Sequence, residues 1–418
     1  MFYLGIDFGT SGARAIAIDK EEHIQVKVQY PFASILGEKL TAIWQEALFS
    51  LIAQIPLEIR QKVREIAING TSSTVLLCNV QGQPVTAPIL YNDSRGVKVL
   101  DELSNMAPTN HIVNSATSSL AKLLWLEKQT VFPQGRYFLH QADWLGFLLH
   151  GRLGISDYHN ALKLGYDVEK LCYPPWLENL SLRSLLPEVL QPGAAIGVVS
   201  QAIVGNYGFP ANCLVCAGTT DSIAAFLASG ANQPGEAVTS LGSTLVLKLL
   251  SQTPVFASQY GIYSHRLGNM WLTGGASNTG GAVLQQFFNT EELADLSQQI
   301  NPHKASNLDY YPLIKPGDRF PINNPNLLPK LTPRPENKVE FLQGLLEGIA
   351  KIEAQGYQLL QSFGANYLKH VYTAGGGAKN SIWRALRQRC LKVPVFISPQ
   401  TEAAFGTALL AKRQGKMN

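Results

Sequence analysis

Two aspartates lie where apolar, strand-like segments of the sequence end. Asp7 stands in the run "LGIDFG" at residues 4–9, and Asp221 follows "CLVCAGTT" at residues 213–220. In phosphoryl transfer one carboxylate can orient Mg²⁺, while another accepts the proton of the attacking hydroxyl. Each aspartate alone also has a structural explanation, because Asp7 could stabilise a turn and Asp221 could cap a helix.

Two short segments rich in glycine and hydroxyl residues connect pairs of apolar runs. The first is Gly9-Thr10-Ser11-Gly12, and the second is Gly242-Ser243-Thr244. Strand-like sequence flanks each segment, which predicts two β-hairpin turns. Backbone N–H groups and hydroxyls in such turns donate hydrogen bonds to phosphate oxygens. Because each turn opens one half of the chain, the repeat indicates a duplicated domain with a phosphate-binding hairpin in each half.

A third glycine-rich turn, Gly375-Gly376-Gly377, precedes helical sequence that begins near Asn380. Glycines let a ligand approach the backbone, and the first turn of a helix presents free N–H groups. Together with the two hairpins, this turn favours phosphate transfer over the structural explanations of the two aspartates. Gly406, within a later helical run, is either a packing contact or a surface for a flat ligand.

Motifs of several other enzyme classes are absent or misplaced. Asp7-Phe8-Gly9 matches the magnesium motif of protein kinases, but no lysine-bearing strand or H-R-D loop precedes it. No G-x-G-x-x-G follows a strand, and the first hairpin leads into another strand, which argues against a Rossmann domain. Cys213 and Cys216 match C-x-x-C, but the sequence offers no second motif for zinc. We interpret both cysteines as core residues.

Length and composition predict two globular domains. The chain has 418 residues, of which 46% are hydrophobic and 15% charged, and its net charge of +4 is too small for a nucleic-acid or membrane surface. No apolar run approaches the ~20 residues of a membrane helix, and no signal peptide is expected because Asp7 interrupts the first apolar run. Five cysteines, an odd number, indicate a reducing cytoplasm or organelle stroma rather than a disulfide framework.

The elements that must position these residues can be outlined from hydrophobic patterns. A third strand at residues 24–30 extends the first hairpin, and residues 63–70 form a buried strand followed by Thr71-Ser72-Ser73-Thr74. Turn-forming residues concentrate at 229–237, which we interpret as the domain boundary. Helical spacing marks further segments: residues 118–129, 141–151 and 339–362, and the stretches that open near Asp221 and near Asn380.

In order and spacing, these segments resemble the FGGY carbohydrate kinases of the actin, sugar-kinase and Hsp70 superfamily. The resemblance covers nearly the whole chain and rests on eight segments: "GIDFGTSGARA" (5–15), "ILYNDSR" (89–95), "SDYHNALKLGYD" (156–167), "AGTTDSIAAFLASG" (217–230), "GEAVTSLGST" (235–244), "FLQGLLEGIAK" (341–351), "AGGGAKNSIWRAL" (374–386) and "EAAFGTALLA" (402–411). It implies an α/β fold with two ribonuclease-H-like domains around a central cleft. Residues 1–230 would form an N-terminal sugar-binding domain, and residues 231–418 a C-terminal nucleotide-binding domain.

The resemblance also implies a role for each matching residue. Asp221 corresponds to the catalytic base, and Asp7 to the aspartate that faces Mg²⁺ and the sugar. The implied sugar site comprises Asp7, Ser11, Gly12, Ala13, Arg14, Ser72 and Asp221. The implied ATP site comprises Thr10, Gly242, Ser243, Thr244, Gly280, Gly376, Gly377 and Asn380. The expected partners are a small sugar and ATP with Mg²⁺, without nucleic acid or membrane, and the expected form is a cytoplasmic monomer or small homo-oligomer.

The loop after residues 63–70 bears on the substrate. Xylulose kinases tend to carry Gln-Met-His there and glycerol kinases an Arg-Glu pair, whereas this chain has Thr71-Ser72-Ser73. The chain is also shorter than many members of the family. In both its loop and its length, this chain resembles the compact ketopentose kinases of cyanobacteria and plants that act on D-ribulose. We therefore expect ATP-dependent conversion of D-ribulose to D-ribulose 5-phosphate.

Other functions remain open on the sequence. D-xylulose is the second substrate candidate, followed by glycerol or another polyol. An actin- or Hsp70-like ATP-binding module that drives conformational change is the candidate from another class. A sugar-binding regulator with an inactive site is disfavoured by the intact Asp7, Asp221 and Gly375 turn.

Overall fold

The computed structural model describes residues 1–32 and 39–412, and the chain divides into two compact units. The first unit comprises Met1–Ala228 and the chain from Glu402 onward, and the second comprises Ser229–Thr401. The predicted boundary after residue 230 lies close to the division after Ala228. The predicted second domain, residues 231–418, includes the last helix, which in the structure packs with the first unit.

A seven-stranded sheet forms the centre of the first unit. Its order is β3-β2-β1-β4-β10-β9, and β11 pairs with β4 beyond the end of β10. Strands β1, β2 and β3 form the predicted antiparallel meander, whereas β4, β10 and β11 run parallel to β1. The strand bounds are β1 Phe2–Phe8, β2 Gly12–Ile18, β3 Ile24–Pro31, β4 Val63–Gly70, β9 Ala195–Val198, β10 Leu214–Cys216 and β11 Thr219–Thr220.

Helices cover both faces of this sheet. Leu4 and Ile6 of β1 pack with Trp44 and Leu48 of α1 and with Leu145 of α5 in one hydrophobic cluster. On the other face, α14 packs against β1, β2, β4 and α9. The nearly continuous burial of β4 follows from this double cover. The helices of this layer are α1 Leu40–Gln54, α2 Leu57–Arg60, α5 Gln141–His150, α8 Gln201–Tyr207, α9 Asp221–Ala228 and α14 Ala403–Lys412.

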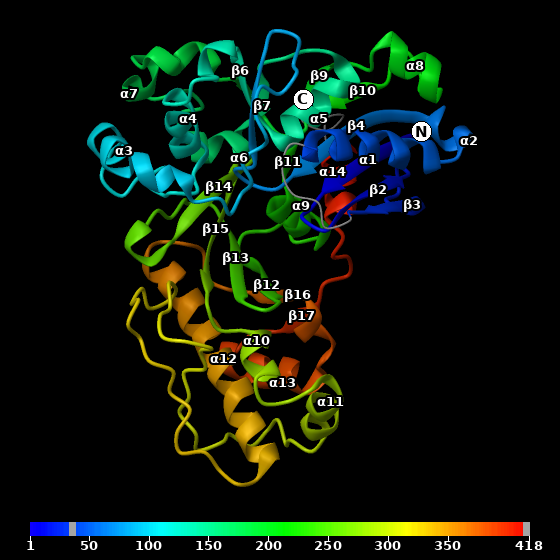
Figure 1. The fold of residues 1–418 in the computed structure, drawn as a ribbon. Helices are drawn as coiled ribbons and strands as arrows, with labels where there is room; N and C mark the ends of the chain where they lie inside the picture. The colour runs from blue at the N-terminus through cyan, green and yellow to red at the C-terminus, as the bar shows by residue number, and fades with distance from the viewer. Residues whose placement is uncertain (33–38, 413–418) are drawn as a thin grey trace. The chain divides into compact units, whose positions relative to one another are not determined.

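Two glycines allow α14 to approach its neighbours closely. A Cβ added to Gly5 of β1 would lie 2.1 Å from the carbonyl oxygen of Ala404, and one added to Gly406 would lie 1.8 Å from that of Ala224. Figure 1 shows the red C-terminal helix α14 beside the blue strands that begin the chain. Gly406 is therefore a packing contact, as the first of its two interpretations held, and these contacts place α14 in the first unit.

The first unit also carries two small sheets between β4 and β9. Strands β5 and β6 pair antiparallel, and β7 and β8 pair parallel. These strands are β5 Val75–Cys78, β6 Tyr137–His140, β7 Ile155–Asp157 and β8 Glu188–Leu190. The accompanying helices are α3 Leu100–Met106, α4 Ser119–Glu127, α6 Tyr158–Ala161 and α7 Pro175–Glu178.

The second unit has a six-stranded sheet in the order β14-β15-β13-β12-β16-β17. Strands β12, β16 and β17 are parallel, and β12, β13, β15 and β14 pair antiparallel in turn. Both units therefore place an antiparallel meander beside parallel strands that come later in the chain, which fits a duplicated domain. The strands are β12 Glu236–Leu241, β13 Leu245–Ser251, β14 Tyr263–Leu267, β15 Met270–Ser277, β16 His370–Ala374 and β17 Val395–Ile397.

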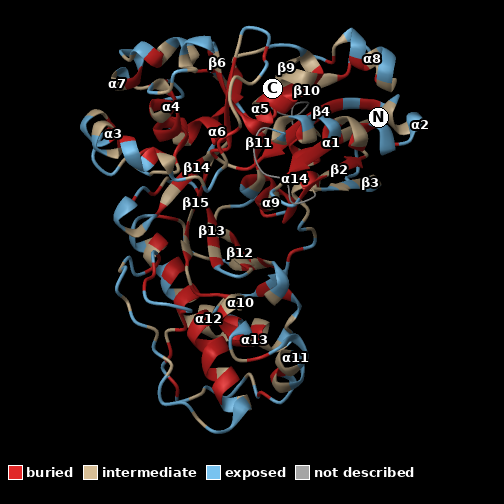
Figure 2. Ribbon diagram, viewed as in Figure 1, coloured by how far each residue is buried: buried red, intermediate tan, exposed pale blue. Residues whose placement is uncertain are grey.

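The long helix α12 packs along its length into the second unit's core. Buried residues follow its length in Figure 2 and pack with the apolar side chains of β12 and β13. A buried ion pair adds to this packing, because Arg387 of α13 donates to Glu353 of α12 at 2.6 and 2.7 Å and to Thr373 of β16 at 2.6 Å. The helices are α10 Gly281–Gln285, α11 Thr290–Gln298, α12 Lys338–Ser362 and α13 Ser381–Leu391.

Two further expectations can be compared with the structure. Cys213 and Cys216 are both buried in the core and form no disulfide with any described cysteine, so their interpretation as core residues is confirmed. Within residues 1–32 and 39–412, no helix combines the length and the apolar character needed to cross a membrane.

Candidate active site

Asp7 lies near the carboxyl end of β1, and its side chain is almost fully buried. The residue is only 5% exposed and stands opposite Arg14 of β2 and Asn69 of β4 in the sheet register. Because side chains alternate along a strand, Asp7 shares the face of Gly5, against which α14 packs. A buried carboxylate at a strand end, with no core function of its own, is the kind of group that a ligand site requires.

Asp221 is brought to the same edge of the sheet. It begins α9 directly after β11, whose Thr220 pairs with Gly70 at the end of β4, the strand beside β1. Burial and the nearby charge of Asp221 raise the pKa of Asp7 to about 6, although Arg14 lowers it. The predicted convergence of the two aspartates is therefore present within the first unit.

Arg14 links Asp7 to the end of the chain. Its Nη1 lies 3.7 Å from Oδ2 of Asp7, and its Nε lies 3.8 Å from Oε2 of Glu402. Glu402 also forms an ion pair of 2.7 Å with Lys27. The guanidinium of Arg14 is thus held between two carboxylates, partly exposed, where it can reach an anionic ligand.

Asn69 is a site residue that the sequence reasoning missed. It is fully buried beside Asp7, donates from Nδ2 to Thr407 of α14 at 2.6 Å, and helps to lower the pKa of Asp7 by a hydrogen bond. A signal existed, because Asn69 is a polar residue near the end of an apolar strand, as Asp7 is. Glu402 gave no such signal, since it lies in a polar turn before a helix.

The first hairpin turn presents the side chains of two predicted ligand residues. Thr10 and Ser11 are exposed, and the turn is closed by a hydrogen bond from the Gly9 N–H to the Gly12 carbonyl at 3.1 Å. Ala13 points into the hydrophobic core. Gly12 packs against the backbone of the neighbouring strand β3, so neither Gly12 nor Ala13 offers a side chain to a sugar.

The loop after β4 forms a tight, internally bonded turn. The Thr74 N–H donates to the Thr71 carbonyl at 3.1 Å, and both the N–H and the hydroxyl of Thr71 donate to Oε1 of Gln141, at 2.9 and 3.1 Å. Ser73 has a φ of 64°, in the left-handed region. Ser72 is the most accessible residue of this turn, and it lies two positions beyond the strand end between the strands of the two aspartates.

In the second unit the predicted phosphate hairpin adjoins the other predicted ATP residues. The N–H groups of Gly281 and Ala282 donate to the carbonyls of Gly242 and Ser243, at 2.9 and 3.2 Å. Gly280, with a φ of 149°, approaches Ser243 so closely that an added Cβ would lie 2.6 Å from its carbonyl oxygen. The structure thus brings Gly280 and the Gly242–Thr244 hairpin together.

The three-glycine turn lies against the same hairpin. A Cβ at Gly375 would lie 2.6 Å from the carbonyl oxygen of Leu241, and one at Gly377 would lie 2.8 Å from the Leu241 side chain. Gly376 is exposed, and an added Cβ there would meet no atom within 4 Å. Gly376 is therefore the member of this turn with room above its backbone for a ligand.

Asn380 caps the helix that follows this turn. Its Oδ1 accepts from the Trp383 N–H at 2.9 Å, and its Nδ2 donates to Ser297 of α11 at 2.8 Å. The predicted helix start near Asn380 is confirmed. Its predicted contact with ATP stays a prediction, since both ends of the amide have protein partners.

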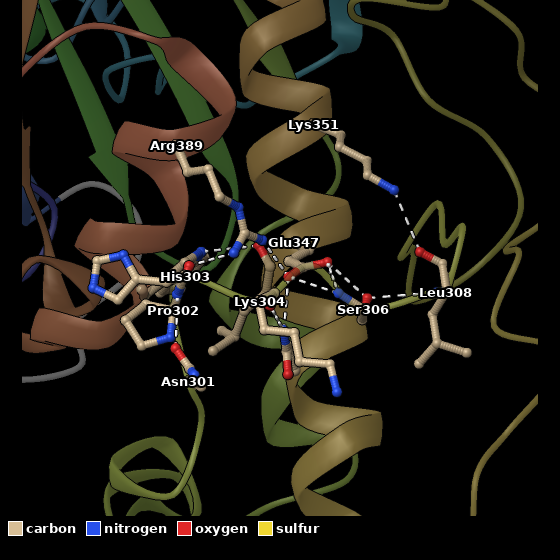
Figure 3. A network of polar contacts seen from close by, with 12 residues as sticks. Asn301, Pro302, His303, Lys304, Ser306, Leu308, Glu347, Lys351 and Arg389 are labelled. Atoms are coloured by element: carbon tan, nitrogen blue, oxygen red, sulfur yellow. Dashed lines mark hydrogen bonds and ion pairs between the residues drawn. The ribbon is translucent and has the colours of Figure 1, made fainter.

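A hollow of about 610 Å³ runs along α13 and begins next to Asn380. Its lining includes Ser381, Arg384, Arg389 and Lys392, and no Asp or Glu lines it. Arg389, in the wall of this hollow, donates to Glu347 of α12 (Figure 3). Glu347 also accepts a hydrogen bond from the Ser306 hydroxyl at 2.6 Å. Its volume lies in the range of small-ligand sites.

A buried Ser–His–Asp arrangement elsewhere in the first unit is not a hydrolytic site. Nε2 of His140 lies 3.2 Å from the hydroxyl of Ser119, and Nδ1 lies 3.0 Å from Oδ2 of Asp143. Ser119 and His140 are fully buried. No substrate can reach a nucleophile in that position, so this chain of hydrogen bonds is structural.

Magnesium can be accommodated by the two aspartates. Among residues 1–32 and 39–412 no group of three or more His, Cys, Asp or Glu side chains is arranged to hold a metal ion. Mg²⁺ in phosphate-transfer sites is usually held by one or two carboxylates, with waters and phosphate oxygens as the other ligands. Asp7 and Asp221, whose negative charges are close enough to raise the pKa of Asp7, fit that pattern.

Models of one protein family match nearly the whole chain. The N-terminal domain of the FGGY family of carbohydrate kinases matches residues 2–228, and the C-terminal domain of that family matches residues 237–414. A xylulose kinase of Staphylococcus xylosus is 21% identical over 98% of this chain and 90% of its own length. An L-fuculokinase of Escherichia coli is 23% identical over 97% of this chain and 91% of its own length.

Solved structures share the fold. The structure of a xylulose kinase from Rhodospirillum rubrum superimposes with a TM-score of 0.86 at 20% identity, over 100% of this chain and 91% of its own. A glycerol kinase of Plasmodium falciparum, solved with ADP, gives a TM-score of 0.84 at 18% identity, over 100% and 90%. The predicted two-domain sugar-kinase fold is thereby confirmed, and the chain belongs to the FGGY family of carbohydrate kinases.

Proposed function

We propose that this carbohydrate kinase transfers the γ-phosphoryl group of ATP to the terminal hydroxyl of a ketopentose, with D-ribulose as its substrate. The observation that carries the proposal is the convergence of Asp7 and Asp221 at one edge of the first unit's sheet. Asp221 accepts the proton of the attacking hydroxyl, whose oxygen forms the new bond to phosphorus as the bond to ADP breaks. When bound, Mg²⁺ neutralises charge on the phosphates, and Asp7 is the residue that would hold it.

The remaining residues divide between sugar and nucleotide. Ser11, Arg14 and Ser72, with the backbone of Gly12 and Ala13, surround the sugar near the two aspartates. Thr10 faces the transferring phosphate. The ATP residues of the second unit are Gly242, Ser243, Thr244, Gly280, Gly376, Gly377 and Asn380. The hollow that begins beside Asn380 offers room for the nucleotide base.

The choice of D-ribulose rests on the turn after β4. A serine hydroxyl donates and accepts over a short reach, so Ser72 serves a sugar hydroxyl that lies close to the strand end. D-ribulose and D-xylulose differ in the configuration of one carbon, so the wrong epimer leaves a buried polar group without a partner. That mismatch costs about 1–3 kcal/mol, or roughly 5- to 150-fold in kcat/KM.

D-xylulose is the second candidate, and the relatives favour it. Proteins named xylulose kinase from Staphylococcus xylosus and Escherichia coli match 98% and 92% of this chain. Their identities of 21% and 23% leave room for a different sugar. The two candidates share the chemistry of Asp221 and differ only in how the sugar is recognised.

Coupled release of ADP across ketopentoses, aldopentoses and polyols tests the proposal. We expect D-ribulose to exceed D-xylulose by at least about tenfold in kcat/KM, with Ser72→Ala narrowing the ratio mainly by impairing D-ribulose. A reversed preference would assign the chain to D-xylulose. ADP release that no sugar or polyol stimulates would instead indicate an ATP-driven conformational module.

The five cysteines bear on where the reaction takes place. None of them forms a disulfide in the structure, which describes all five. Reduced thiols are usual in reducing compartments, which supports a cytoplasmic location for the proposed kinase.

A further inference from the structure

Lys122, in the middle of α4, carries a fully buried amino group that the proposed reaction does not use. The residue has 0% exposure. Its Nζ donates to the carbonyl oxygens of Ser73 and Leu90, both at 2.7 Å, and lies 3.5 Å from that of Tyr91. All three hydrogen-bond partners are main-chain carbonyls, which come from two separate loops.

The first of these loops is the turn that carries Ser72. Residues 71–74 follow β4, and Ser73 holds a left-handed conformation that residues other than glycine avoid. The Ser73 hydroxyl is buried without a hydrogen-bond partner in the structure, so the carbonyl bond to Lys122 is what fixes this residue. Ser72, directly before it, is the residue we propose to sense the sugar.

The second loop, residues 89–91, is tied to the first. The Tyr91 N–H donates to the hydroxyl of Thr74 at 3.0 Å, and Ile89 and Val75 exchange backbone hydrogen bonds at 2.9 and 3.0 Å. Lys122 adds a third link between the two loops, because its ammonium group has three donors and faces three carbonyl oxygens from these loops. Lys122 therefore links α4 to both loops through their main chains.

Burial of this group is costly, which argues that its position matters. Burial lowers the pKa of Lys122 to about 7, with Lys163 and Arg95 acting in the same direction and Asp93 opposing them. Asp93 is itself paired with Arg95 at 2.6 Å. An apolar side chain of the same length would avoid the cost of burying charge, but it would leave the Ser73 carbonyl without the Lys122 donor and the Leu90 carbonyl with the Asp93 N–H as its donor.

We propose that Lys122 is a positioning residue for sugar recognition, which holds the Ser72 turn and the 89–91 loop at a fixed separation and thereby sets the discrimination between pentulose epimers. It acts through the main chain and does not touch the substrate. The inference rests on the proposed role of Ser72 in sugar binding. A displacement of about 1 Å in a substrate-positioning group can reduce the rate by up to about 100-fold, so small movements of this turn suffice.

Lys122→Met tests the proposal, because methionine keeps the length of the side chain and removes its donors. We expect the KM for D-ribulose to rise by roughly 10- to 100-fold, while the KM for ATP stays within about twofold. The ratio of kcat/KM between D-ribulose and D-xylulose should fall toward one. Lys122→Gln, which keeps a neutral donor, should lie between the wild type and Lys122→Met, and it carries the test if Lys122→Met does not fold.

Lys128→Met is the matched control. Lys128 caps the end of the same helix, is half-exposed and pairs with Glu102 at the surface. Its loss should leave both KM values and the epimer ratio unchanged. A folded Lys122 variant with an unchanged sugar KM and epimer ratio, or with sugar and ATP KM raised together, would overturn the proposal.

Amide hydrogen exchange separates this proposal from the proposed function. Loss of Lys122 should reduce protection in residues 71–74 and 89–91, whatever sugar the enzyme uses. Unchanged protection in both loops of the variant would overturn the positioning role of Lys122 even if D-ribulose is the substrate. If the wild-type protein phosphorylates neither pentulose, the proposed function is contradicted. If the Lys122 variant still shows reduced protection in both loops, the role of Lys122 in holding these loops stands.

Discussion

Asp221 begins α9 at the edge of the sheet that also carries Asp7, and it is the proposed base for the attacking hydroxyl. Replacing it with alanine should lower kcat by roughly 10²- to 10⁴-fold, the usual range for a general base. ATP affinity should change little, because the proposed nucleotide residues other than Thr10 lie in the second unit. Single-turnover kinetics with titrated ATP check both points, and the exposed Asp101→Ala on α3 serves as control. A kcat within a few-fold of the wild type would remove Asp221 from the mechanism.

Asp7 should give the reaction an acid limb. Its pKa of about 6, raised by burial and by Asp221, means that the carboxylate takes up a proton as the pH falls through 6. A proton on Asp7 competes with Mg²⁺, so activity at subsaturating Mg²⁺ should decline below that pH and recover as Mg²⁺ is added. Arg14 lowers the pKa of Asp7, and Arg14→Gln should therefore move the limb to higher pH. A limb that responds neither to Mg²⁺ nor to Arg14→Gln would exclude Asp7 as its origin.

Among the elements, α14 covers one face of the first unit's sheet by very close packing. It lies on β1 and α9 through glycines that leave no room for a Cβ, and the closest approach is 1.8 Å at Gly406. Gly406→Ala must push the helix away from a backbone carbonyl, so we expect a loss of about 1–3 kcal/mol or more in the free energy of unfolding. α14 also carries Thr407, which accepts a hydrogen bond from Asn69 beside Asp7. With rising denaturant, the same variant should therefore lose activity at a lower concentration than the one at which it unfolds.

Gly205→Ala is the matched control for this prediction. Gly205 lies within α8, and an added Cβ there would meet nothing within 4 Å. Alanine is the better helix former, so this variant should gain about 0.5–1 kcal/mol. Denaturant melts of both variants give the comparison, and equal stability of Gly406→Ala and the wild type would show that α14 can move without cost.

At the scale of the whole molecule, the chain passes between its two units twice, after Ala228 and before Glu402. One proposed phosphate-binding hairpin lies in each unit, so we expect ATP and sugar together to draw the units closer than either ligand alone. Closure of this kind excludes water from the transferring phosphate. Small-angle scattering of the free, sugar-bound, nucleotide-bound and doubly bound protein measures the radius of gyration. Four equal radii would contradict ligand-driven closure.

Much of the local structure was determined by the sequence itself. The hairpin around Gly9–Gly12, the buried strand at residues 63–70 and the helix that starts after Asn380 were all predicted, because each depends on neighbouring residues only. Alternating apolar positions, turn residues and a helix cap act within a few residues of one another. The family followed from the order and spacing of such segments, and the comparisons confirmed it.

Only the tertiary structure decided which distant segments share one site. The assignment of α14 to the first unit depends on contacts between Gly406 and Ala224, which no local pattern encodes. Lys122 looked like an ordinary helical lysine, and its role depends on carbonyls 49 and 32 positions earlier in the chain. Burial and long-range hydrogen bonding are properties of the folded chain. The side chains that surround the two aspartates could therefore be identified only from the tertiary structure, which brings distant strands and helices together.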